Sequence, residues 1–277
     1  MQTYFVGLGG FIQKDGEMIG MTLSEKANLA ESAACASGEM LERRGAFSVS
    51  KKSENDFVTE MDFKSEALIR DLLLSACPED AFFGEEYGGA ETAQGRWIVD
   101  PIDGTANYMR GQRLYTISIA YEQNGELAVG CVYCPGTDEL FLAVRGEGAT
   151  LNGRPIHVSD TAVMRSALVH LGFGHRNPGC LRRTLGRFPD LIGAVSDVRR
   201  SGTAAYDLCC VADGRSDAFV ELGLNLYDYA AGCVILREAG GRLTGWEMDE
   251  NGIATGNILA TNGTLHEPLR RILLGRE

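Results

Sequence analysis

The sequence predicts a protein of the α+β / α/β class, and two observations carry this prediction. Residues 115–144 hold three apolar, strand-like runs joined by short turns, a pattern typical of antiparallel neighbours. From about Thr161 onward, strand-like runs alternate with helical patterns, as they do in βα units. No linker separates the two halves. We therefore expect an α+β subdomain over residues 22–160 and an α/β subdomain over residues 161–277, sharing one cleft.

Residues 1–21 are predicted to be an N-terminal extension. Their glycine-rich run Val6–Phe11 invites comparison with a dinucleotide-binding loop. The third glycine of such a loop would fall at position 12, which is Ile12, and no strand–loop–helix pattern surrounds it. The comparison therefore does not support a nucleotide site.

Two helices are predicted to follow the extension. Thr22 and Glu25 form a capping box, and apolar residues continue at helical spacing to about residue 44. The second helix is expected to begin near Asp62, a plausible N-cap, and to run to about Ser75.

The remaining elements are read from apolar runs and turn residues. Strands of the first subdomain are expected at 81–83, 97–99, 115–121, 127–133 and 139–144, with turns at Asn124-Gly125 and Pro135-Gly136. In the second subdomain we expect strands at 167–171, 197–199, 218–221 and 258–260, and helices near 179–187, 203–213 and 228–238 and from His266.

The stretch from Trp97 to Tyr108 concentrates charge at the end of a strand. Asp100 and Asp103 stand three residues apart, so their carboxylates and the carbonyl of Ile102 could converge on one point. Oxygen ligands of this kind favour Mg²⁺, Mn²⁺ or Ca²⁺. The N–H groups that open the following helix would suit a phosphate. The alternative is a strand that ends in an Asx turn, with aspartates that only cap a helix.

Composition excludes several classes of function. Acidic residues outnumber basic ones, 38 against 26, and the net charge of −12 argues against a nucleic-acid-binding surface. Eight scattered cysteines fit reduced thiols in a cytoplasm, and the pair Cys131 and Cys134 is interpreted as two buried cysteines. No membrane span or signal peptide is indicated, so we expect a cytoplasmic protein.

Three segments, Gly84–Glu86, Asp100–Asn107 and Leu226–Gly232, together resemble the inositol monophosphatase family in their order and spacing. The resemblance covers about residues 22–275. It implies a layered αβαβα sandwich of the inositol monophosphatase / fructose-1,6-bisphosphatase type. It also implies a Mg²⁺-dependent, lithium-sensitive phosphomonoesterase, usually a homodimer, that acts on a small phosphorylated substrate.

The resemblance assigns roles to individual residues. It implies two or three Mg²⁺ ions per site, held by Glu85, Asp100, the carbonyl of Ile102, Asp103 and Asp228. The catalytic residues would be Thr105, Asp62 and Glu85, with in-line attack by a metal-activated water. The substrate would meet Asp103, Gly104, Thr105, Ala106, Gly202, Thr203, Ala204, Glu221 and Asp228. Lys51 matches a basic position that could contact a third metal ion or the phosphate.

The identity of the alcohol stays open at this stage. Tyr227 stands where relatives usually have tryptophan, Ala106 where they have threonine, and Asn225 where some have histidine. Inositol monophosphate is the first expectation, with histidinol phosphate or another sugar or nucleotide phosphate as the alternative. Arg199 and Arg200 could contact an anionic substrate or only solvate a strand end.

Two rival hypotheses belong to other classes. Cys209 and Arg215 have the spacing of a cysteine-based phosphatase, but the residues between them read as an apolar helix without the glycine-rich loop that cradles phosphate. A non-catalytic regulatory or binding protein on this fold is the other rival, although such a protein would be expected to have lost a metal ligand.

Overall fold

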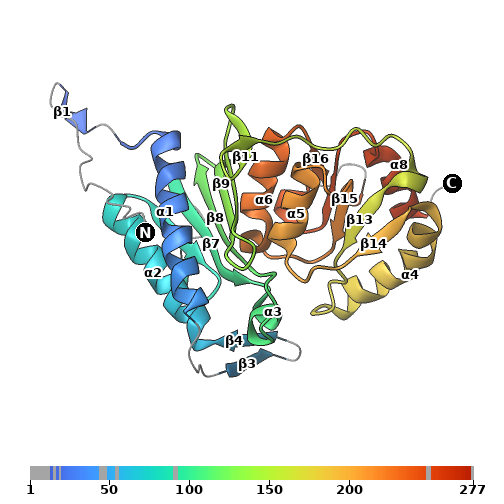
Figure 1. Cartoon of the computed structure of the whole chain (residues 1–277), viewed down its shortest axis with the longest axis horizontal. Coiled ribbons are helices and arrows are strands. Elements are labelled where there is room, and N and C mark those ends of the chain that lie inside the picture. The colour runs from blue at the N-terminus through green and yellow to red at the C-terminus, as the bar shows by residue number, and fades with distance from the viewer. Residues whose placement is uncertain are drawn as a thin grey trace.

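Helices and sheets alternate in layers across the molecule (Figure 1). The computed structural model describes residues 13–14, 17–18, 20–43, 49–53, 56–89, 93–247 and 251–275. The helices are α1 (Leu23–Glu42), α2 (Glu60–Ala76), α3 (Thr105–Met109), α4 (Pro178–Ala194), α5 (Ala204–Ala212), α6 (Leu226–Glu238), α7 (Gly252–Thr255) and α8 (His266–Leu274), with a 3₁₀ turn at Met164–Ser166. No helix in this described part combines the length and apolar character that a membrane crossing requires.

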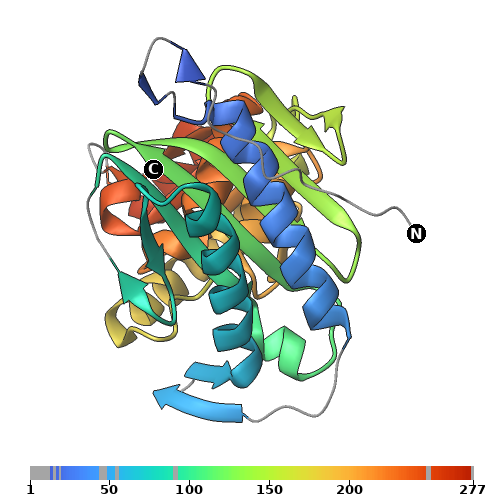
Figure 2. The same ribbon diagram turned by 90° about the vertical axis from the view of Figure 1, so that its left-hand side faces the viewer.

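The larger sheet has eight strands in the order β12-β11-β10-β9-β8-β7-β5-β6. Its pairs are antiparallel except for β5 with β7. These strands are β5 (Ala81–Gly84), β6 (Gly88–Gly89), β7 (Gly95–Asp103), β8 (Thr116–Gln123), β9 (Glu126–Cys134), β10 (Glu139–Val144), β11 (Gly148–Leu151) and β12 (Arg154–Pro155). Figure 2 shows α1 and α2 side by side on the outer face of this sheet.

The smaller sheet has five strands in the order β14-β13-β15-β17-β16. They are β13 (Leu168–Leu171), β14 (Asp197–Arg199), β15 (Ala218–Glu221), β16 (Arg242–Thr244) and β17 (Ile258–Thr261). The first three run parallel, and β17 is antiparallel to both its neighbours. Helices α4 and α8 cover its outer face, where Leu191, Leu269 and Leu273 are buried. Two short hairpins complete the described strands, β1 (Gln13–Lys14) with β2 (Glu17–Met18), and β3 (Val49–Ser53) with β4 (Asp56–Thr59).

Helices α5 and α6 fill the layer between the two sheets (Figure 1). A row of small residues crosses the larger sheet beneath these helices. Its members are direct pairing partners on four adjacent strands: Ala120, Gly130, Ala143 and Ala149. The row lets α6 approach closely: a Cβ placed on Gly130 would lie 2.3 Å from the carbonyl oxygen of Ala231. The close packing of the central helices on the sheet therefore depends on the small size of these residues as well as on apolar contacts.

The structure confirms the predicted fold class and layered architecture. The first capping box is also confirmed, since Thr22 N donates to Glu25 Oε2 at 2.8 Å and Glu25 N donates to Thr22 Oγ1 at 3.2 Å. The predicted turn at Asn124-Gly125 has φ of 54° and 80°, as a two-residue hairpin turn requires. The division at residue 160 stays a prediction.

Some predicted elements were wrong or missing. Thr59, not Asp62, is the N-cap of α2; Asp62 lies three residues into the capping box and accepts the Thr59 N–H at 2.7 Å. Helix α4 does not stop near residue 187 but continues past Pro189, because its last turns bury Leu191 under the smaller sheet. Strand β16 and helix α7 had not been predicted, since each is too short to show a period.

Buried His266 is expected to make the free energy of unfolding depend on pH. Its Nε2 lies 3.0 Å from Arg270, which can only donate, so Nε2 accepts and the proton resides on Nδ1, 2.9 Å from Thr261 Oγ1. Burial, and then the charges of Arg242 and Arg270, lower the pKa of His266 to about 3. In the unfolded chain the imidazole takes up a proton near its ordinary pKa of 6.5.

We therefore expect the free energy of unfolding to fall as the pH is lowered from about 6.5 toward 4, because the unfolded state binds the extra proton. A His266→Asn variant should show a smaller difference between urea titrations at pH 7.5 and pH 5 than the parent chain. The exposed His157 provides the control, and His157→Asn should keep the full difference. Equal pH dependence in parent and His266→Asn would contradict this assignment.

Candidate active site

A bulge in β7 brings the two aspartates of the central stretch to one place. Asp100 pairs with Ser118 and Asp103 with Thr116, so three steps along β7 match two along β8. Strand alternation alone would put side chains three residues apart on opposite faces. The extra residue cancels that alternation, and Asp100 and Asp103 line the same cavity.

The cavity has a volume of about 180 Å³ and is lined by residues of β7, α3, α5 and α6 and by residues at the ends of β13 and β15. Six acidic side chains line it: the four predicted metal ligands Glu85, Asp100, Asp103 and Asp228, together with Asp207 and Glu221. The predicted substrate positions Gly104, Thr105, Ala106, Gly202, Thr203, Ala204 and Glu221 line it as well, as does Ile102. The structure thus brings together residues that are spread over 144 positions of the sequence.

The acidic side chains act on one another electrostatically. Burial raises the pKa of Asp100 well above its usual value, and the charges of Glu85, Asp103 and Asp228 raise it further. Burial likewise raises the pKa of Asp228 strongly, with Asp103 and Glu85 as the largest contributing charges. Like charges gathered in a buried place repel each other, and a cation placed among them would relieve that repulsion.

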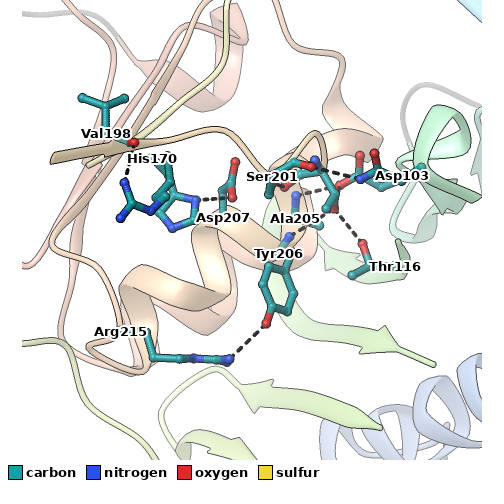
Figure 3. Close-up of polar contacts among 12 residues, drawn as sticks. Asp103, Thr116, His170, Val198, Ser201, Ala205, Tyr206, Asp207 and Arg215 are labelled. Atoms are coloured by element: carbon teal, nitrogen blue, oxygen red, sulfur yellow. Dashed lines mark hydrogen bonds and ion pairs between the residues drawn. The ribbon is translucent and has the colours of Figure 1, made fainter. Parts of the chain in front are cut away.

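Asp103 is held in place by the first turn of α5 (Figure 3). Its Oδ2 accepts hydrogen bonds from Thr203 Oγ1 at 2.6 Å and from Ala205 N at 2.8 Å. Burial raises the pKa of Asp103 to about 7, although these two hydrogen bonds oppose the shift. One carboxylate oxygen is therefore committed to the scaffold, and the residue is oriented by a helix from the other half of the chain.

Asp228 and Glu85 are positioned by their own elements. Asp228 lies in the first turn of α6, where its Oδ2 accepts the Asn225 N–H at 2.6 Å. Glu85 follows β5 in a turn whose next two N–H groups, of Glu86 and Tyr87, donate to Glu66 at 2.7 and 2.9 Å. Sequence reasoning missed Glu66. The only signal for it is Gly84, which leaves room for the Glu66 carboxylate 2.0 Å from where its Cβ would be.

The four predicted metal ligands suit a hard divalent cation in their donor chemistry. All four side chains are carboxylates, and the repulsion among them is the condition that Mg²⁺ binding would remove. Within the described residues no three acidic, histidine or cysteine side chains meet as a finished ligand set. Binding would therefore require the carboxylates to rotate toward a common point.

Asp62 and Thr105 form the predicted pair beside this cluster. Thr105 Oγ1 lies 3.1 Å from Asp62 Oδ1 and 3.0 Å from the carbonyl oxygen of Ile102. The other oxygen of Asp62 accepts the N–H and the hydroxyl of Thr59, both at 2.7 Å. Asp62 does not line the cavity itself, whereas Thr105 does. Asp62 thus belongs to the capping box of α2, and its catalytic role stays a prediction.

The far end of the cavity is lined by residues that sequence reasoning did not single out, namely His175, Arg176 and Asp207. Arg200 also lines it, whereas Arg199 points to Asp197. Glu221 accepts the Gly174 N–H at 3.2 Å, and burial raises the pKa of Glu221 to about 7. No motif marks these positions. His175 and Arg176 follow β13 and Glu221 ends the parallel strand β15, whereas Asp207 is supplied by α5.

Two other predicted residues fall elsewhere. The backbone of Lys51 belongs to β3, but its side chain lies outside the described residues. Cys209 is buried in α5, burial raises the pKa of its thiol well above the usual value, and Arg215 pairs with Glu139 and Asp213. The cysteine-phosphatase spacing is therefore accidental. All eight cysteines are free, and Cys131 and Cys134 are both buried, as expected.

Comparisons with known proteins bear on this site. A sequence profile of the inositol monophosphatase family matches residues 22–274. Nus factor SuhB of Haemophilus influenzae is 37% identical over 252 residues, which cover 88% of this chain and 94% of that protein. Inositol-1-monophosphatase of Synechocystis sp. is 40% identical over 225 residues, 80% of this chain and 78% of that protein. The crystal structure of SuhB from Bartonella henselae superposes with a TM-score of 0.86 at 37% identity, covering 90% of this chain and 98% of that one.

Proposed function

The chain belongs to the inositol monophosphatase family, and from this premise we propose that it is a Mg²⁺-dependent phosphatase that hydrolyses inositol monophosphate to inositol and phosphate. One observation carries the proposal. Asp100 and Asp228, whose pKa values are raised by burial and by neighbouring acidic charges, line a single cavity with Glu85 and Asp103, next to a threonine hydroxyl held by a buried aspartate. A phosphate monoester needs cations to neutralise its oxygens, and a cluster of this kind is suited to hold them.

Glu85, Asp100, Asp103, Asp228 and the carbonyl of Ile102 would hold two or three Mg²⁺ ions in this proposal. The ions would neutralise the phosphate and lower the pKa of the attacking water. The Asn107 N–H in the first turn of α3 already donates to the Gly104 carbonyl at 2.8 Å, so the N–H groups of Thr105 and Ala106 would be the ones to meet the phosphate oxygens.

Thr105 orients the attacking water in the proposed reaction. Its hydroxyl proton points to Asp62 or to the Ile102 carbonyl, so an oxygen lone pair remains to accept a hydrogen bond from water. Asp62, fixed by two hydrogen bonds from Thr59, keeps that hydroxyl in one orientation. In this proposal Thr105 supplies a directed acceptor for the water, and the leaving alcohol would lie toward Glu221 in the same cavity.

Phosphate release from a small substrate panel tests the proposal. Inositol 1-phosphate, histidinol phosphate, fructose 1,6-bisphosphate and adenosine 3′,5′-bisphosphate would each be assayed with Mg²⁺, with chelator, and with Mg²⁺ plus Li⁺. We expect inositol 1-phosphate to be fastest, Li⁺ to inhibit, and chelator to reduce the rate by about a hundredfold or more. A faster rate with histidinol phosphate would replace the substrate but keep the mechanism. Chelator-resistant turnover would contradict the metal assignment.

A regulatory or binding role without catalysis is the second candidate. It is favoured by the names of several relatives, since the proteins from Haemophilus influenzae and Pseudomonas aeruginosa are called Nus factor SuhB. Absence of turnover with any phosphomonoester, despite measurable Mg²⁺ binding, would support it. The homodimer remains a prediction from the family resemblance, and the cytoplasmic location remains a prediction from the cysteine pattern and the hydropathy of the sequence.

A further inference from the structure

Asp207 is a buried carboxylate of the cavity to which the proposed metal and water chemistry gives no part. It lies on α5, one helical turn beyond Ala204, and both residues line the cavity. Only 3% of Asp207 is exposed. Its backbone N–H donates to the carbonyl of Thr203 at 3.1 Å, so the residue is fixed to the same helix turn that holds Asp103.

His170 holds the side chain of Asp207 (Figure 3). It lies on β13, which is flanked by β14 and β15 in the smaller sheet, and its Nδ1 contacts Asp207 Oδ1. The second carboxylate oxygen, Oδ2, has no hydrogen-bond partner among the described residues. A carboxylate that served only an internal ion pair would have no reason to line a cavity with one oxygen uncommitted.

The surroundings of Asp207 indicate what kind of group it meets. Glu221 lines the same end of the cavity, and the charge of Asp207 contributes to the raised pKa of Glu221, so the two carboxylates are near each other. Arg176 and Arg200 line this end too and balance the two negative charges. This end of the cavity can accept hydrogen bonds through its two carboxylates, and the two arginines offset their negative charge. It is therefore suited to bind neutral hydroxyl groups.

We infer that Asp207 determines specificity by accepting a hydrogen bond from a hydroxyl group of the leaving alcohol, and that His170 is the residue that positions it. The inference rests on the proposed phosphatase function and deepens it. It assigns the substrate to the monophosphates of polyols, whose several hydroxyls can reach Asp207 and Glu221 together. An alcohol without further hydroxyls gains nothing from Asp207.

Substrate discrimination tests the inference. The parent chain and Asp207→Ala would be compared on inositol 1-phosphate, on p-nitrophenyl phosphate, which has no hydroxyl, and on phosphoethanolamine, which carries an ammonium group. We expect kcat/KM for inositol 1-phosphate to fall about tenfold to a hundredfold, the range for one hydrogen bond to a charged group. The value for p-nitrophenyl phosphate should change less than about twofold, because its leaving group makes no such bond.

His170 variants separate positioning from folding. His170→Phe should reproduce most of the loss of discrimination, whereas His170→Gln, whose amide can still donate to Asp207, should restore it. Asp213→Asn, at the other end of α5, is the matched control and should keep the parent ratio of the two substrates.

Each remaining outcome overturns the inference in a recognisable way. Equal losses with inositol 1-phosphate and p-nitrophenyl phosphate would make Asp207 a structural residue. The largest loss with phosphoethanolamine would make the recognised group an ammonium and not a hydroxyl. No turnover by the parent chain on any substrate would remove the proposed function, and this inference with it.

Discussion

An Asp100→Asn variant is expected to lose Mg²⁺-dependent phosphate release by at least about a thousandfold and yet to melt at a higher temperature than the parent chain in chelator. The first effect follows from the proposed role of Asp100, because an amide cannot neutralise the cation that the reaction needs. The second follows from the cluster itself. Asp100 is buried with Glu85, Asp103 and Asp228, and a neutral residue of the same shape removes its share of their repulsion.

The predicted gain in stability has a definite pH dependence. The pKa of Asp100 is raised well above its ordinary 3.8, so the folded state retains a proton that the unfolded state releases. The carboxylate therefore lowers stability increasingly as the pH rises above about 4, and the neutral asparagine does not. The melting temperatures of variant and parent should differ more at pH 8 than at pH 5, by about 2–4 °C for each kcal/mol of repulsion removed.

Thermal melts in chelator and phosphate release at saturating Mg²⁺ measure the two effects separately. Asp160→Asn changes an exposed aspartate and should alter neither quantity. Normal turnover by Asp100→Asn would exclude Asp100 from the set of metal ligands. A lower melting temperature in chelator would show that the charge of Asp100 stabilises the fold, against the direction of its pKa shift.

Gly130→Val is expected to destabilise the fold strongly. A Cβ at this position would lie 2.3 Å from the carbonyl oxygen of Ala231 and 3.0 Å from the Cβ of Val234, so the valine methyl groups would collide with α6. Neither neighbour is a flexible side-chain end, and α6 cannot withdraw because α5 and the smaller sheet pack against its other faces. We expect a loss of about 3 kcal/mol and a melting temperature lower by roughly 6–12 °C.

Gly186→Ala is the matched control, with the opposite expected sign. Gly186 lies inside α4, and a Cβ there would meet nothing within 4 Å. Alanine should therefore stabilise the protein by about 0.5–1 kcal/mol through its higher helix propensity. Urea or thermal unfolding of the two variants measures both. An unchanged melting temperature for Gly130→Val would mean that α6 can move away from the sheet at little cost.

Structural features that depend on residues close together in the sequence could be predicted from local patterns. The capping box at Thr22, the hairpin at Asn124-Gly125 and the carboxylates after β7 are each visible within a dozen positions. The three motif segments then give the family and, with it, the layered architecture. At these positions the local sequence preferences agree with the overall fold, so the structure could be predicted from neighbouring residues.

Features that depend on distant partners could not be predicted. The contact between His170 and Asp207 joins a strand to a helix 37 positions away, and each residue alone reads as part of an apolar element. The sequence predicts that Asp100 and Asp103 converge, but it does not predict the bulge that achieves this, because the bulge is set by the register of β7 with β8. The extension of α4 beyond Pro189 depends on Leu191 being buried against another layer.

Because α6 lies between the two sheets, the acidic site is complete only when both sheets have folded. Asp228 begins this helix, whose buried residues contact strands of both sheets, so it has no stable place until both have formed. A partly folded chain would carry Asp100 and Asp103 without Asp228 and without the α5 turn that holds Asp103. Amide protons of α6 should accordingly exchange only through global opening, and any ion that requires Asp228 will protect the whole molecule from opening and not merely the loops around it.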